Sequence, residues 1–256
     1  MKRPKDILAG GVLAVPALFL AALMVLPFVA LIADGGLLAI GRGFECRLTW
    51  PALRLSLWTT TLATVVIVVG GTPLAWILSR SRSRLARAFE TFLQLPMVIP
   101  PAVGGIALLL TFGPHGMLGS WLAPLGFNPK SSATAVIMAQ VFVSSPLYIQ
   151  SAVVAFARAS ASQAVSLRSA LPAARPWLLN GAAMSWARAL GEFGATLMFA
   201  GNIGGLTQTL PLAIYVALGL DLRTAQGLSL LLVLVAFALL MLFRLVNRPP
   251  KTPGDH

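Results

Sequence analysis

The stretch Leu-Leu-Leu-Val-Leu-Val-Ala-Phe-Ala-Leu-Leu-Met-Leu-Phe, residues Leu230–Phe243, contains no polar side chain. It lies within a longer apolar segment, residues 227–246. A helix of about 20 apolar residues is long enough to cross the hydrocarbon core of a bilayer. This segment therefore predicts a transmembrane helix.

Five more apolar segments precede it, and they cover residues 7–33, 56–78, 92–112, 133–155 and 177–200. The first is too long for the apolar core of a signal peptide, which spans about 7–15 residues, and we interpret it as a retained span. The sequence thus predicts an all-α, polytopic transmembrane bundle of about six spans. Residues 1–256 would form a single transmembrane domain.

The composition agrees with lipid as the solvent. Apolar residues make up 57% of the chain and charged residues only 10%, whereas soluble domains carry roughly 25% charged residues. The net charge of +12 could indicate nucleic-acid binding. However, the cations form short clusters between the apolar segments, so we expect a membrane protein and no nucleic-acid partner.

The cations also predict the orientation, because Lys and Arg are retained on the cytoplasmic side during insertion. One set of alternate connections holds 13 of them: Lys2, Arg3, Lys5, Arg80, Arg82, Arg84, Arg87, Arg158, Arg168, Arg175, Arg244, Arg248 and Lys251. The other set holds five: Arg42, Arg47, Arg54, Lys130 and Arg223. Both termini are therefore predicted to be cytoplasmic.

Metal and cofactor chemistry is not indicated. Cys46 is the only cysteine, which excludes an intrachain disulfide or a thiolate cluster. His115 and His256 have no neighbouring residues that resemble metal ligands. We expect neither a metal site nor a cofactor.

The segment 92–112 contains Pro96, Pro100 and Pro101. Proline removes a backbone donor and kinks a helix, and in lipid the freed carbonyl groups need other partners. The prolines indicate either a simple break near the cytoplasmic end of the span or a bent helix that lines a pathway. The sequence does not choose between them.

The segment 177–200 contains two charged residues, Arg188 and Glu192, at a spacing that lets them pair on one helix face. Charges within a membrane are costly and usually face a bundle interior or a wet cavity. The pair predicts a structural lock or a gate, and Glu192 is not expected to bind an anion. Gly191 and Ala195, also four residues apart, would share a face that allows close helix packing.

The turn-rich segment that follows is suited to a loop or a re-entrant connection. Its hydroxyls and amides could bind an anion, or could equally satisfy the loop backbone. Our candidates for the pathway or gate are Arg188, Gly191, Glu192, Thr196, Asn202, Thr207, Gln208 and Thr209.

Three stretches resemble a known family. They are LPMVIPPAVGGIALLLTFG at residues 95–113, AVIMAQVFVSSPLYIQSA at 135–152 and WARALGEFGATLMFAGNIGGLTQTLPLAIY at 186–215. Together they are similar to the permease subunit of molybdate/tungstate ABC importers, with sulfate permeases as close relatives. The resemblance extends over most of the chain from Ser56 to Leu230 and is more specific than a short motif.

The resemblance implies a homodimeric pore for oxyanions in the cell membrane. It also implies two cytoplasmic ATPase subunits and an extracytoplasmic oxyanion-binding protein as partners. The chain has no Gly-x-x-x-x-Gly-Lys-Ser/Thr phosphate loop, so we expect no enzymatic activity in this subunit and ATP hydrolysis in a separate one.

The cytoplasmic coupling loop of the family is shortened here, to residues 157–176. The closing Leu171-Pro172 is present, but the acidic start is reduced to Gln163-Ala164 and the family's glycine is missing. Candidates for ATPase coupling are Gln163, Ala164, Leu167, Arg168, Leu171 and Pro172. The loop could dock as a short helix, the copy could be impaired by a deletion, or the sequence could lack a piece.

Other functions receive less support from the sequence. A sulfate or thiosulfate ABC permease is the nearest alternative. A stand-alone secondary anion transporter usually needs several ionisable groups within the membrane, and only Arg188 and Glu192 qualify. A membrane enzyme would need a nucleophile–base or metal set, which we do not find.

Overall fold

The computed structural model describes residues 4–125, 132–159 and 166–246, and within these ranges every regular element is a helix. The predicted all-α bundle is therefore confirmed. By length and composition, four helices can cross a membrane: Ala14–Gly36, Thr49–Arg80, Ala133–Ala159 and Leu222–Leu245. A fifth crossing is possible if one bent helix pair counts as a span.

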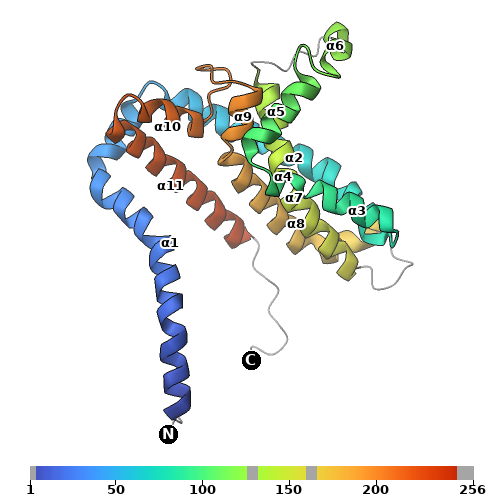
Figure 1. The fold of residues 1–256 in the computed structure, drawn as a ribbon, viewed down its shortest axis with the longest axis horizontal. Helices are drawn as coiled ribbons and strands as arrows, with labels where there is room; N and C mark the ends of the chain where they lie inside the picture. The colour runs from blue at the N-terminus through green and yellow to red at the C-terminus, as the bar shows by residue number, and fades with distance from the viewer. Residues whose placement is uncertain (1–3, 126–131, 160–165, 247–256) are drawn as a thin grey trace.

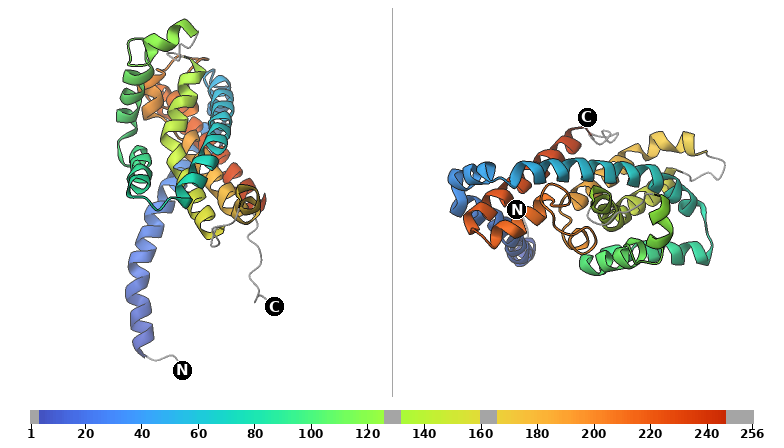
Figure 2. Two further views of the ribbon diagram at one scale, coloured as in Figure 1. Left: turned by 90° about the vertical axis from the view of Figure 1, so that its right-hand side faces the viewer. Right: turned by 90° about the horizontal axis from the view of Figure 1, so that it is seen from above.

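The first helix, α1 (Pro4–Glu45), contains the predicted span 7–33 and is interrupted at Gly36, which has a positive φ of 55°. Glycine adopts this left-handed conformation at little cost because it has no Cβ. None of the Ala14–Gly36 window is buried against the rest of the chain. Figures 1 and 2 show this part of α1 (blue) extending away from the other helices, so its apolar side chains face lipid or another chain.

Three helices form the first core cluster: α2 (Thr49–Arg80), α7 (Ala133–Ala159) and α8 (Leu167–Leu190). Its buried residues are mostly alanines, which allow close helix approach where apolar burial gives little driving force. The cluster consists of Ile67, Ala75, Tyr148, Ala152, Ala155, Phe156, Ala170 and Ala174. It brings the C-terminal ends of α2 and α7 next to the N-terminal end of α8.

This junction gathers three of the predicted cytoplasmic cations, Arg80, Arg158 and Arg168, at one end of the bundle. Two of them are held over indole rings: the Arg80 guanidinium lies 4.9 Å from the Trp76 ring centre, and that of Arg158 lies 4.6 Å from the Trp177 ring centre. Such contacts are typical of interfacial residues with an apolar body and a polar end.

The predicted third span, 92–112, is not a single crossing helix. The chain forms α3 (Arg84–Leu93), α4 (Leu95–Val98) and α5 (Pro101–Phe112), with a bend of 114° between the α3–α4 pair and α5. Ile99 is extended (φ −72°, ψ 146°), as expected of a residue that precedes proline. The break that the prolines predicted is confirmed, and α5 has only 12 residues, too few to cross a bilayer alone.

The predicted span 177–200 is also divided. Helix α8 begins at Leu167 and ends at Leu190, and a separate helix α9 (Gly194–Phe199) follows after a three-residue break. Gly191 is the C-cap of α8, so Gly191 and Ala195 do not lie on the face of one helix, and that expectation was wrong. The physical reason is that Glu192 bonds both Arg188 on α8 and the Ala195 N–H on α9.

The chain ends its described part with α10 (Leu210–Leu218) and α11 (Leu222–Val246). The short elements α6 (Gly119–Leu122) and a 3₁₀ turn (Ala123–Leu125) follow α5. Asp221 caps α11: its carboxylate accepts hydrogen bonds from the Thr224 hydroxyl (2.7 Å) and N–H (3.0 Å). The hydroxyl bond is the main reason why the pKa of Asp221 is lowered.

Helices α1 and α11 lie side by side in Figure 1. They approach closely at two glycines, Gly43 on α1 and Gly227 on α11. A Cβ at Gly43 would lie 2.7 Å from the Gly227 carbonyl carbon, so the two backbones touch. A Cβ at Gly41, on the same helix, would meet nothing within 4 Å.

We predict that Gly43→Ala lowers the free energy of unfolding by about 1–3 kcal/mol, because overpacking forces the backbones of α1 and α11 apart. Gly41→Ala is the matched control and should be neutral or stabilise by up to about 1 kcal/mol, the helix-propensity gain. Thermal unfolding of both variants in detergent measures the difference. Equal melting temperatures would contradict the crossing.

Candidate functional site: a buried polar junction

The break between α8 and α9 is held by Glu192, whose side chain is 1% exposed. One carboxylate oxygen accepts a hydrogen bond from Arg188 Nη1 (2.9 Å), and the other accepts one from the Ala195 N–H (2.8 Å). The predicted pair is confirmed, since the residues form an ion pair. However, Glu192 also satisfies a free N–H in the first turn of α9, which explains why the chain leaves the helix here.

This arrangement makes Glu192 a link between two helices. The Arg188 side chain is 33% exposed, so the pair joins a partly exposed guanidinium on α8 to a fully buried carboxylate just before α9. Both carboxylate oxygens are already occupied by these two donors.

Helix α9 is fixed against α5 by small residues. A Cβ at Gly105 would lie 2.7 Å from the Ala195 carbonyl oxygen, and one at Gly194 would lie 3.1 Å from the Ala102 nitrogen. The same helix packs on α7 through Ala195 and Phe199. The bent α4–α5 segment and the broken α8–α9 segment therefore contact each other directly.

The loop after α9 is organised by its own side chains. The Thr207 hydroxyl accepts a hydrogen bond from the Ile203 N–H (2.9 Å) and donates one to the Gly201 carbonyl (3.2 Å). Gln208 donates from its amide to Asn202 Oδ1 (3.0 Å). Gly201 and Gly205 have φ values of 79° and 77°, which favour glycine. Thus the side chains of Asn202, Thr207 and Gln208 form hydrogen bonds that stabilise the loop.

Helix α2 presents a buried polar face to this loop, which the sequence reasoning missed. Ser56 and Thr60 are one turn apart and both are 0% exposed. Ser56 Oγ accepts a hydrogen bond from the Leu210 N–H (2.7 Å) at the start of α10, and Thr60 Oγ1 accepts one from Gln140 Nε2 (3.3 Å) on α7. Hydroxyls spaced by four residues in an apolar span were the signal that could have identified this face.

Three buried polar atoms at this junction have no hydrogen-bond partner among the described residues. They are Gln140 Oε1, Thr196 Oγ1 and Thr209 Oγ1. Leaving such a group unpaired costs roughly 1–3 kcal/mol, so each needs an explanation. Of the predicted pathway residues, Thr196 and Thr209 are therefore the ones with a buried side-chain oxygen that has no partner among the described residues.

The predicted coupling residues divide between two environments. Leu167 and Leu171 pack against the core cluster of α2, α7 and α8, whereas Arg168 and Pro172 are exposed. They belong to the first turns of α8, which a Ser166–Ser169 capping box begins. Gln163 and Ala164 lie outside the described residues.

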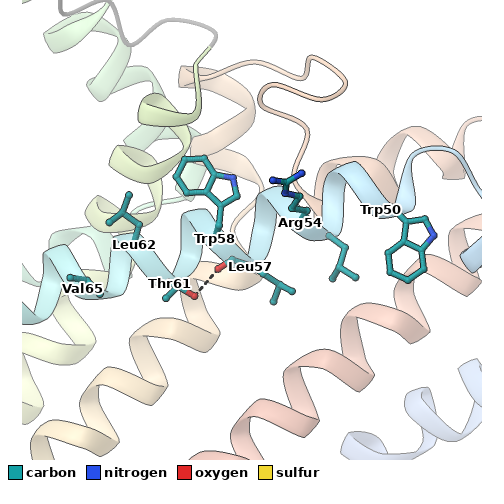
Figure 3. A pocket seen from close by; sticks show the side chains of 8 residues that line it. Trp50, Arg54, Leu57, Trp58, Thr61, Leu62 and Val65 are labelled. Carbon is teal, nitrogen blue, oxygen red and sulfur yellow. Dashed lines mark hydrogen bonds between the residues drawn. The ribbon is translucent and has the colours of Figure 1, made fainter.

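Two surface hollows accompany these features, and both are mainly apolar. One, of about 850 Å³, lies between α8 and α11 and includes Trp177, Asn180 and Arg244. The other, of about 710 Å³, follows the outer side of α2 (Figure 3). Its lining residues are Trp50, Leu53, Arg54, Leu57, Trp58, Thr61, Leu62 and Val65. Among the described residues, no group of three or more metal-ligating side chains occurs.

The fold is similar to that of a chain in a solved ABC transporter. It matches a solved bacterial ABC transporter that imports the acidic polysaccharide alginate, with a TM-score of 0.69, 14% identity and 97% coverage of both chains. At this identity the match shows the fold alone. The search against protein-family models found no match.

Relatives of known name define the family. The molybdenum transport system permease protein ModB of Mycobacterium tuberculosis is 44% identical over 197 residues, 72% of this chain and 75% of that protein. ModB of Azotobacter vinelandii is 37% identical over 209 residues, 77% and 92% of the two chains. The chain belongs to the family of molybdenum transport system permeases, which confirms the resemblance seen in its sequence. It is a multi-pass protein of the cell membrane and, as a permease subunit, not itself an enzyme.

We predict that Arg188→Ala destabilises the protein more than Glu192→Ala. The first change leaves a buried carboxylate with one backbone donor, whereas the second leaves a half-exposed cation that can reach water or lipid phosphate. We expect Arg188→Ala to lower the free energy of unfolding by about 2–4 kcal/mol and Glu192→Ala by about 1–2 kcal/mol. Both values are smaller than for a fully buried pair, because Arg188 is partly exposed to solvent.

The double variant should cost less than the sum of the two single changes, because the residues interact directly. Unfolding in detergent of the wild type and the three variants gives this cycle. Additive costs would show that the ion pair has no energetic significance.

Proposed function

We propose that this chain, as a homodimer, forms the translocation pathway of an ATP-driven importer for molybdate- and tungstate-type oxyanions. The observation that carries the proposal is the 44% identity over 197 residues to a permease named for molybdenum transport. Sulfate is a tetrahedral dianion of the same kind and the nearest alternative substrate, but the relatives reported above are named for molybdenum.

The proposal assigns energy and delivery to other polypeptides. The chain contains no phosphate-binding loop, so two cytoplasmic ATPase subunits would supply the energy. An extracytoplasmic oxyanion-binding protein would deliver the anion. The lipid-exposed or chain-exposed surface of α1 and the hollow between α8 and α11 leave apolar area available to a second copy.

The joint between α8 and α9 supports a gate at this position. Because the helix is broken at Gly191–Phe193, the angle between α8 and α9 can change without loss of helical backbone hydrogen bonds. The last carbonyls of α8 already lack helical partners at this break. The Arg188–Glu192 pair holds the joint in the arrangement described here. We propose that alternation of the pathway includes movement at this joint.

We predict ATP-dependent uptake of labelled molybdate by vesicles that contain this chain, its ATPase and the binding protein on the outer side. Omitting any one component should reduce uptake to background, because delivery, pathway and energy are separate. Competition with tungstate and with sulfate measures the substrate class. Preferential transport of sulfate would show that sulfate, and not molybdate, is the substrate.

Helix α8 offers a test of ATPase docking. Arg168 is exposed at the cation-rich end of the bundle, and we predict that Arg168→Glu weakens retention of the ATPase by at least fivefold in a pull-down, through lost charge complementarity. Arg223→Glu, an exposed position on the opposite predicted side, is the matched control. Equal retention of the ATPase by both variants would exclude Arg168 from the interface.

A further inference from the structure

Two of the three unpartnered polar atoms, on Thr209 and Gln140, belong to residues that lie next to the same buried face of α2. Thr209 immediately precedes Leu210, whose N–H donates to Ser56 Oγ on α2 (2.7 Å). One helical turn further along α2, roughly 6 Å away, Thr60 Oγ1 accepts a hydrogen bond from Gln140 on α7 (3.3 Å). Thus Thr209 and Gln140 approach neighbouring turns of the same buried face.

Thr196 lies on α9, the helix that packs against α7, which carries Gln140. The residues next to Thr196 and Gln140 in the chain, Ala195 and Ala139, belong to one core cluster between α9 and α7. Thr196 is 0% exposed, Gln140 is 1% exposed and Thr209 is 1% exposed. Three elements therefore each contribute one buried polar group with an unused hydrogen-bonding site.

Ordinary structural roles do not occupy these groups. Thr209 is the N-cap of the nine-residue helix α10, but its hydroxyl makes no capping hydrogen bond. Most other buried hydroxyls nearby are occupied: Thr59 Oγ1, for example, donates to the Leu55 carbonyl at 2.8 Å within its own helix. Thr196 and Thr209 are therefore as buried as Thr59, but their hydroxyls lack the hydrogen bond that the Thr59 hydroxyl makes.

The amide of Gln140 can supply a third donor. The oxygen and nitrogen of a glutamine amide are assigned from the hydrogen-bond network, and reversing them exchanges their roles. The Thr60 hydroxyl would then donate to the amide oxygen, which leaves the amide N–H₂ free to donate. Two hydroxyls and one amide would then be three uncharged donors, and one of them, the Thr209 hydroxyl, lies at the N-terminus of α10, where the helix dipole favours negative charge.

From this arrangement we propose that Gln140, Thr196 and Thr209 form an uncharged site that binds the oxyanion during its passage. The inference rests on the proposed function and adds the residues that would contact the anion. Neutral donors suit a transient site, because a dianion bound by several cations would be released slowly. The one buried carboxylate close by, Glu192, is balanced by Arg188 and by the Ala195 N–H.

The site is closed in the arrangement described here, since all three groups are buried. Separation of α9 and α10 from α7 and α2 would open it, and the joint at Gly191–Phe193 allows α9 to move relative to α8. The cost of leaving the donors unpaired when the site is closed would favour the state that binds the anion.

The test compares Thr196→Val, Thr209→Val and the double variant with Thr59→Val, an equally buried control whose hydroxyl bonds only its own helix. Each is reconstituted with the ATPase and binding protein, and uptake of labelled molybdate and the melting temperature are measured. The double variant should lose at least tenfold in uptake per ATP hydrolysed, with an unchanged or higher melting temperature. Thr196→Ser with Thr209→Ser should retain uptake, because the hydroxyls remain.

Three outcomes would overturn the inference. Uptake by the double variant within twofold of Thr59→Val would show that the hydroxyls have no part in transport. Normal uptake together with a higher melting temperature would show that they hold only a buried water or nothing. If the wild-type complex transports no molybdate, tungstate or sulfate, the proposed function fails and this inference with it, whereas the first two outcomes leave that function intact.

Discussion

The structure depends on one constraint: in lipid, backbone and side-chain polar groups must find partners within the protein. The four long apolar helices meet this constraint through their own backbone ladders. Where the ladder stops at Gly191–Phe193 and in the loop 201–209, side chains replace two of the missing partners. Glu192 accepts a hydrogen bond from the Ala195 N–H, and Thr207 accepts one from the Ile203 N–H.

Small residues make these irregular points possible. Gly105 lets α5 reach the backbone of α9, and Gly43 and Gly227 let α1 reach α11. Alanine fills most of the cluster between α2, α7 and α8. Close contact between backbones gives tight packing in a solvent where apolar burial alone gives little. A moving permease benefits from this, since such interfaces can separate at a few defined places without exposing large side chains.

The buried polar junction differs from these tightly packed small-residue contacts. Ser56 is hydrogen-bonded to Leu210 and Thr60 to Gln140, while Gln140 Oε1, Thr196 Oγ1 and Thr209 Oγ1 have no partner among the described residues. A protein selected for stability alone would be expected to replace such groups with apolar ones. Their presence in a chain that we propose carries an oxyanion is the reason to connect them with the substrate.

The sequence alone determined the solvent, the helical class, the positions of the four long apolar helices, the kink at Pro100–Pro101, the pairing of Arg188 with Glu192 and the family. These follow from hydropathy, proline chemistry and residue spacing, which are local properties. It overestimated the continuity of 92–112 and 177–200, because average hydropathy does not register where a backbone is interrupted. Only the tertiary structure decided that Glu192 joins two helices, that Gln208 bonds Asn202 while Thr207 bonds the loop backbone, and that Gln140 meets Thr60. Hydrogen-bond partners 80 residues apart depend on how helices pack, and no local pattern contains that information.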